Sequence, residues 1–182
     1  MKTLQLKDIA CYLPYGLKFF YKRIDDEPAL LHTLDGITIE EDMNDNYDLR
    51  FLVGDDAYCW MSDSPKILVE YTTSWFKPIL RPISDLYKPL EDGTIPIVEL
   101  AKISFPNAAN WDYCKGDNYS FSDLDNVRFI YNAEENAFLI LGYDSSIMFA
   151  KNQIQLFDYL SEHHFDYRGL IEKGLAIDIN TI

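Results

Sequence analysis

The sequence predicts an α+β fold, with a mainly antiparallel sheet built from hairpins and packed with about three helices. Two observations support this class. Strand-like runs follow one another through short turn signals, instead of alternating regularly with helices. Apolar residues recur with helical spacing in three stretches, near the N-terminus, in the middle and before the C-terminus.

The N-terminal stretch predicts a helix, a strand and a hairpin. Helical spacing is shared by Leu6, Ile9, Ala10 and Leu13. Pro14 and Gly16 then end this helix, and a strand follows through "LKFFYK" at 17–22. Asp35 and Gly36 separate two β-rich runs, and this dipeptide supplies the positive φ angles of a two-residue hairpin turn.

The middle of the chain predicts further strands and a proline-rich stretch. Residues 42–48, "DMNDNYD", are interpreted as a polar loop. Strands are expected in "YDLRFLV" at 47–53 and in "KILVEYTT" at 66–73. Residues 75–89 hold three prolines, each lacking a backbone donor, so this stretch is expected to be irregular or to lie at a sheet edge.

The second half predicts two helices, a hairpin and a last strand. A helix over 96–105 is indicated by Pro96 at its start and by the shared face of Ile97, Leu100, Ala101 and Phe105. Residues 110–126 are interpreted as a long polar and aromatic loop. Residues 127–143 form the clearest hairpin, with "AEEN" at its turn, before a helix at 152–165 and a strand at 175–180.

Length and composition predict one folded domain. The chain of 182 residues can bury a hydrophobic core, and we expect residues 1–182 to form a single globular domain. Its 48% hydrophobic and 15% aromatic content excludes intrinsic disorder, because disordered chains lack such residues.

The charge of the chain is strongly negative and unevenly distributed. The formal net charge of −14 repels DNA, RNA and anionic lipid, so direct nucleic-acid or membrane binding is not expected. Residues 25–63 form an acidic segment with a single base, Arg50. Its twelve acids are Asp25, Asp26, Glu27, Asp35, Glu40, Glu41, Asp42, Asp45, Asp48, Asp55, Asp56 and Asp63.

The cysteines and the N-terminus indicate a cytoplasmic protein. Cys11, Cys59 and Cys114 are widely spaced, odd in number and without a zinc-site pattern, which fits a reducing compartment. The first sixteen residues include Lys7 and Asp8 where a signal peptide needs an apolar stretch. No run approaches the 18 apolar residues typical of a membrane span.

The stretch "SEHHFDYRGL" at 161–170 concentrates reactive side chains, yet we interpret it as structural. On a helix starting near Asn152, His164 falls inside the apolar arc and His163 at its border, while Glu162 and Asp166 point away. Adjacent histidines do not ligate one metal easily from a single helix. His164 is therefore predicted to be a hydrogen-bonded core residue and His163 a boundary residue.

Other chemical signals are incomplete. A calcium-like spacing is shared by Asp42, Asn44, Asn46 and Asp48, but Tyr47 replaces the turn glycine and Val53 replaces the closing glutamate. No local signature pairs a cysteine with His32 or His163, and there is no glycine-rich phosphate loop. The aromatics of residues 110–121 could stack a sugar or a base, although such residues more often anchor a loop.

Three stretches, "CYLPYGLKFFYK", "KPILRPISDL" and above all "LFDYLSEHHFDYRGLIEKGLAIDINTI", resemble a family of uncharacterised proteins encoded in phages and prophages of Bacteroides-type gut bacteria. The resemblance covers both ends and the middle of the chain. It implies a phage-related origin and a bacterial cytoplasmic site of action. It carries over no catalytic residue.

The sequence favours a non-enzymatic protein-binding module. Such a module would bind a basic host or phage protein, with its carboxylates imitating nucleic-acid phosphates or inhibiting the partner. The candidate binding residues are Asp25, Asp26, Glu27, Glu40, Glu41, Asp42, Asp45 and Asp48. No catalytic residue, metal ligand or cofactor is assigned, and a merely solubilising acidic face is an alternative.

The second hypothesis is a metal-dependent hydrolase that uses carboxylates with His163 or His32. It requires a pocket in which these groups meet. The oligomeric state is left open, although exposed hairpin edges would permit a dimer by strand pairing.

Overall fold

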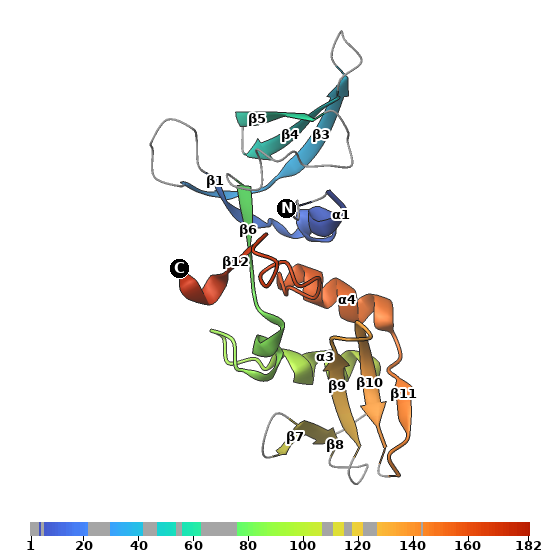
Figure 1. Ribbon diagram of the computed structural model, residues 1–182. Helices are drawn as coiled ribbons and strands as arrows, with labels where there is room; N and C mark the ends of the chain where they lie inside the picture. The colour runs from blue at the N-terminus through green and yellow to red at the C-terminus, as the bar shows by residue number, and fades with distance from the viewer. Residues whose placement is uncertain are drawn as a thin grey trace. The chain divides into compact units, whose positions relative to one another are not determined.

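The structure is a computed structural model that describes residue 4 and residues 6–21, 30–41, 47–53, 56–62, 76–106, 111–114, 118–121, 127–142 and 144–182. The fold is α+β, as predicted, and the described ranges hold three α-helices and three sheets (Figure 1). Two compact units are distinguished, Met1–Pro82 with Ser161–Ile182, and Ile83–Leu160. Each unit has its own sheet or sheets, and the single domain stays a prediction.

The first unit contains a four-stranded mixed sheet. Its order is β12-β6-β1-β2, and its strands are β1 (Lys18–Tyr21), β2 (Leu30–Thr33), β6 (Phe76–Leu80) and β12 (Ile177–Asp178). β1 pairs antiparallel with β2 and β6, whereas β12 pairs parallel with β6. The predicted strands near 17–22 and 175–180 are confirmed, although the last one is only two residues long.

A short helical segment packs against the core of this unit. The predicted helix has one α-helical turn, α1 (Leu6–Ile9), and continues as a 3-10 helix over Ala10–Tyr15 until Gly16, whose φ of 65° ends it. Tyr12, on this 3-10 helix, is fully buried. The core comprises Leu4, Ile9, Tyr12, Leu17, Phe19, Leu34, Phe76, Leu80, Leu170, Leu175 and Ala176.

The first unit also contains an antiparallel three-stranded sheet of β3 (Gly36–Glu41), β4 (Tyr47–Val53) and β5 (Asp56–Ser62). The hairpin predicted at Asp35 and Gly36 is wrong, because β2 and β3 belong to different sheets. Gly36 is the first residue of β3 and pairs with Leu52 on β4. Leu34 is buried and donates its N–H to the Leu17 carbonyl at 2.8 Å, which extends the β1–β2 ladder.

The proline-rich stretch 75–89 is more regular than predicted. Its first part is β6, which lies inside the sheet between β1 and β12, and its second part is a 3-10 helix over Ile83–Tyr87. Pro78 has no backbone N–H, yet β6 tolerates it. On the β12 side of β6 only Ile79 and Leu80 are paired, so no described strand needs a hydrogen bond from Pro78 there. The predicted strand at 66–73 and most of the predicted loop at 42–48 lie outside the described residues.

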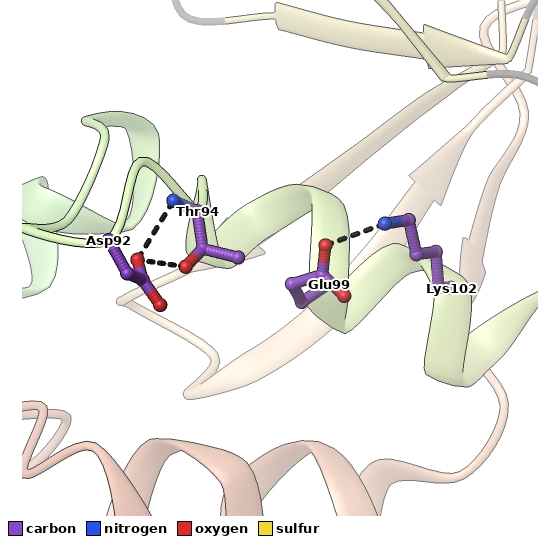
Figure 2. A network of polar contacts seen from close by, with 4 residues as sticks. All are labelled: Asp92, Thr94, Glu99 and Lys102. Atoms are coloured by element: carbon purple, nitrogen blue, oxygen red, sulfur yellow. Dashed lines mark hydrogen bonds and ion pairs between the residues drawn. The ribbon is translucent and has the colours of Figure 1, made fainter.

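The predicted central helix in the second unit is confirmed as α3 (Pro96–Ser104). Ile97, Leu100 and Ala101 are fully buried on its inner face. Figure 2 shows the turn before α3, where the Asp92 carboxylate accepts hydrogen bonds from the backbone N–H (2.9 Å) and the hydroxyl of Thr94. It also shows Lys102 donating to Glu99 at 2.6 Å, an i,i+3 ion pair along the helix.

A five-stranded antiparallel sheet follows in the order β11-β10-β9-β8-β7. Its strands are β7 (Trp111–Cys114), β8 (Asn118–Phe121), β9 (Arg128–Asn132), β10 (Ala137–Leu141) and β11 (Ile147–Phe149). The β9–β10 hairpin confirms the clearest sequence prediction. The stacked rings of Phe129 and Phe138, 5.5 Å apart, are buried between these strands.

The loop predicted at 110–126 is wrong in part, because β7 and β8 pair within it. Their register sets Trp111 opposite Phe121 and Tyr113 opposite Tyr119. The same residues that suggested a binding loop therefore form a strand ladder. The short strand β11 was not predicted.

The predicted last helix is α4 (Gln153–Glu162), shorter than the expected 152–165. Gln153 fixes its start, since the side-chain amide donates to the carbonyls of Phe138 (2.7 Å) and Ala150 (3.0 Å). Leu156 and Leu160 are fully buried, whereas Ile154 is 76% exposed although periodicity placed it on the apolar face. After β12 the chain ends in a 3-10 helix over Ile179–Thr181.

Candidate functional site

The acidic segment forms a hairpin whose register brings carboxylate residues together. Glu40 on β3 is the direct antiparallel partner of Asp48 on β4, and Glu41 pairs with Tyr47. Asp42 and Asp45 fall between Glu41 and Tyr47 in the sequence and lie outside the described residues. We call Glu40, Glu41, Asp42, Asp45 and Asp48 the acidic hairpin end.

Acidic residues that face each other across two strands are expected to repel each other in the free protein. Like charges directly opposite one another on antiparallel strands destabilise the pair, because the two residues are the closest cross-strand neighbours. Arg50, the single base of the acidic segment, pairs with Thr38 and so lies two residues along the strand from Asp48. The register therefore places two acidic residues opposite each other, with the base Arg50 two residues away along β4.

The other three candidate binding residues, Asp25, Asp26 and Glu27, lie outside the described residues. They belong to the connection between β1 and β2, a different hairpin from β3–β4. The structure thus brings Glu40 and Asp48 together with Glu41 beside them. It does not place the 25–27 group relative to them.

The stretch "SEHHFDYRGL" ends a helix and anchors the chain that follows. α4 stops at Glu162, so His163 and His164 lie in the turn after it and not on the predicted helical face. His164 has a φ of 56°, in the left-handed region that ends helices. The backbone of its neighbours pairs with Arg81: the Arg81 N–H donates to the His164 carbonyl, and the Asp166 N–H to the Arg81 carbonyl, both at 2.8 Å.

The His164 side chain is a bridge within the first unit. Its Nε2 lies 3.1 Å from the Tyr15 carbonyl oxygen, and its ring is half-buried. Burial lowers the pKa of His164, an effect that the hydrogen bond to Tyr15 opposes. The predicted hydrogen bond is confirmed, and the predicted position on the helix is wrong.

Asp166 caps the turn after Phe165. It is 7% exposed, and its two carboxylate oxygens accept the N–H groups of Leu170 (2.8 Å) and Ile171 (2.7 Å). Burial raises the pKa of Asp166, and these two hydrogen bonds act in the opposite direction. Both oxygens accept hydrogen bonds from backbone donors, so this carboxylate fixes the turn.

Cys11, Ser161, Tyr167 and Arg168 form a polar cluster in the first unit. Tyr167 shares hydrogen bonds with the side chains of Cys11 and Ser161, and burial raises its pKa. Burial acts to lower the pKa of Arg168, but the neighbouring Tyr167 and Cys11 raise it overall. The Arg168 guanidinium also lies 5.3 Å from the Tyr167 ring centroid, a cation–π contact. Sequence reasoning missed this cluster because Cys11 is about 150 residues away from its partners.

The described residues do not assemble the metal centre of the hydrolase hypothesis. In those ranges no group of three or more His, Cys, Asp or Glu side chains could hold a metal ion. His32 lies on β2 opposite Phe19, with the two ring centroids 5.6 Å apart. The calcium-like spacing at 42–48 ends on β4, where Asp48 is a regular strand residue.

Comparison of the chain with protein-family models, with curated proteins and with solved structures found no match. Among the helices that the structure describes, none combines the length and apolar character needed to cross a membrane.

Proposed function

We propose that the protein is a non-enzymatic protein-binding module whose acidic hairpin end binds a basic protein partner. The observation that carries the proposal is the cross-strand pairing of Glu40 with Asp48. Two like charges at this register position lower the stability of the free protein by roughly 0.2–1 kcal/mol. A basic partner would relieve this repulsion, so binding would stabilise the same carboxylates.

The partner class follows from charge. The register sets Glu40 opposite Asp48 with Glu41 next to Glu40, and Asp42 and Asp45 fall between them in the sequence. Closely spaced negative charge is what the phosphate-binding surface of a nucleic-acid-binding protein accepts. In the setting that the sequence resemblance implies, this partner is a basic host or phage protein in the bacterial cytoplasm. Asp25, Asp26 and Glu27 stay candidate binding residues because they carry the same charge.

The carrying observation can be tested in the free protein. Glu40→Gln removes one of the two facing charges, so we expect the free energy of unfolding to rise by about 0.2–1 kcal/mol at low salt. Glu41→Gln is the matched control, because Glu41 faces the uncharged Tyr47. Urea unfolding at low and high salt measures both. A Glu40→Gln variant no more stable than the Glu41→Gln control would remove the basis of the proposal.

Binding is tested with a matched pair of variants. One changes the five acids of the acidic hairpin end to Asn or Gln, and the other makes the same change of charge at Glu91, Glu134, Glu135, Asp158 and Glu172. A partner is captured from host lysate at low salt, purified, and titrated against each variant by calorimetry. Exposed ion pairs contribute roughly 0.2–1 kcal/mol each, so we expect the loss of five to weaken binding by roughly 5- to 4,000-fold, and the control to bind like the wild type.

Salt supplies an independent measurement. Binding through exposed charges weakens as ionic strength rises, because salt screens them. A captured partner whose affinity is equal for the two variants, or unchanged between low and high salt, contradicts charge-based recognition. The acidic hairpin end would then be a solubilising surface.

A further inference from the structure

The strand β11 is an apolar edge of the five-stranded sheet. It is the last strand in the sheet order, with β10 on one side (Figure 1). Its three residues are all exposed, Ile147 by 65%, Met148 by 55% and Phe149 by 67%. Natural proteins usually protect such edges with charges, prolines or bulges, because a free edge pairs with other strands. β11 itself carries no such protection.

Hydrogen bonds to β10 show which backbone groups of β11 are free. The Ala150 N–H donates to the Phe138 carbonyl at 2.9 Å, and the Gly142 N–H donates to the Ser146 carbonyl at 2.8 Å. Bonded and non-bonded pairs alternate along an antiparallel ladder, so Met148 also directs its N–H and C=O toward β10. The N–H and C=O groups of Ile147 and Phe149 consequently point away from β10, toward the open edge.

We propose that β11 pairs antiparallel with β11 of a second copy of this chain, around a two-fold axis beside Met148. In this register Ile147 of each copy faces Phe149 of the other copy, as two-fold symmetry requires. All four outward groups of each strand are then used, and apolar side chains meet on the same face of a continuous sheet. This interface is independent of the acidic hairpin end.

Charge at the two ends of β11 favours a second copy as the occupant. Asp144 precedes the strand and Lys151 follows it, and both are exposed. Antiparallel pairing brings the Asp144 end of one copy to the Lys151 end of the other, twice, whereas parallel pairing would set like charges together. The strand is thus complementary to itself in hydrogen bonds, in apolar side chains and in charge.

The size of the contact predicts a weak dimer. Side chains of this size that are more than half exposed offer roughly 100 Å² each, so six of them bury roughly 600 Å² before the backbone is counted. This area is below the roughly 1,200–2,000 Å² of stable interfaces. We therefore expect monomer and dimer to exchange with concentration.

The first test is sedimentation equilibrium of the full chain over a wide range of concentrations. We expect the mass to rise from 21.2 kDa toward twice that value. The double variant Ile147→Lys and Phe149→Lys places four cations together in the dimer. Its dimer should therefore dissociate at least tenfold more readily than that of the wild type. Ile182→Lys is the control, because Ile182 is 63% exposed and far from β11 in the sequence. A wild type that is monomeric throughout overturns the proposal, as does a double variant that dimerises like the control.

The second test determines which residues of the two β11 strands face each other, and it does not require a variant that weakens the pairing. Met148 faces its own copy as a non-hydrogen-bonded pair, with Cα atoms about 4.5 Å apart, a separation that a disulfide spans. Met148→Cys should therefore cross-link into a dimer under mild oxidation, with the bond located by peptide mapping. Ile147→Cys should cross-link much less, since residue 147 faces residue 149. Equal or reversed cross-linking of these two variants contradicts the register.

Discussion

Tyr12 tests how strongly the chain after α4 is held to the N-terminal segment. It is fully buried, and its hydroxyl donates a hydrogen bond of 2.9 Å to the Phe165 carbonyl, 153 residues away. Its ring also lies 6.1 Å from that of Tyr167 and 6.3 Å from that of His164. Tyr12→Phe keeps these ring contacts and removes only the hydroxyl.

The expected loss of stability follows from the group left behind. A typical hydrogen bond contributes about 1 kcal/mol net, and a buried acceptor left without its donor costs about 1–3 kcal/mol. We therefore expect Tyr12→Phe to lower the free energy of unfolding by about 1–3 kcal/mol. For a chain of this length the melting temperature should fall by roughly 2–10 °C.

The effect also has a defined pH dependence. Burial raises the pKa of Tyr12 well above its ordinary value of 10.0. The folded phenol thus stays protonated where the unfolded one ionises, so its contribution is complete below about pH 10 and declines as the pH rises further. The difference between wild type and Tyr12→Phe should be constant below about pH 10 and become smaller above it.

Urea unfolding followed by tyrosine fluorescence and circular dichroism measures both quantities. Tyr15→Phe is the matched control, because Tyr15 belongs to the same 3-10 helix and its side chain is 36% exposed. The control should stay within about 0.5 kcal/mol of the wild type. A Tyr12→Phe variant as stable as this control would refute the reasoning.

Two further predictions concern the turns after α4. Asp166→Asn keeps only one of the two side-chain oxygens that accept backbone N–H groups and should cost about 1–3 kcal/mol, measured by urea unfolding. The pKa of Asp166 is raised in the fold from its ordinary 3.8, so its titration contributes stability that is complete below 3.8 and lost as the pH rises through the folded pKa. The advantage of the wild type over Asp166→Asn should therefore become smaller across that window, and a constant difference would contradict this expectation. Gly174 has a φ of 72°, and the space that a Cβ would occupy has no other atom within 4 Å, so Gly174→Ala should cost about 1–2 kcal/mol from backbone strain alone. Gly174→Asn should cost less, since Asn tolerates this conformation, and thermal melts that rank the two variants in the opposite order would exclude this cause.

Local patterns predicted the elements whose signals lie within a few residues. α3 shows its apolar face and its initial proline in the sequence, and the β9–β10 hairpin shows two β-rich runs around a polar turn. The α+β class follows from the order of such elements. These features depend on contacts between near neighbours, which sequence periodicity records.

Elements that depend on distant partners were predicted less well. The Asp35-Gly36 pair has the composition of a hairpin turn, yet the two flanking strands join different sheets. Residues 111–121 have the polar and aromatic composition of a loop, yet their aromatic residues pair across β7 and β8. In both cases the choice of strand partner is a tertiary property, since it depends on which surfaces are buried together.

The sequence by itself determined the composition of the candidate site, and the tertiary structure decided its geometry. The concentration of acids in residues 25–63 and the distribution of charge are properties of composition and need no fold. The pairing of Glu40 with Asp48, the anchoring of Phe165 by Tyr12 and the open edge of β11 arise only when distant segments are brought together. The physical reason is that burial and strand register, which join residues far apart in the chain, leave no periodic signal in the sequence.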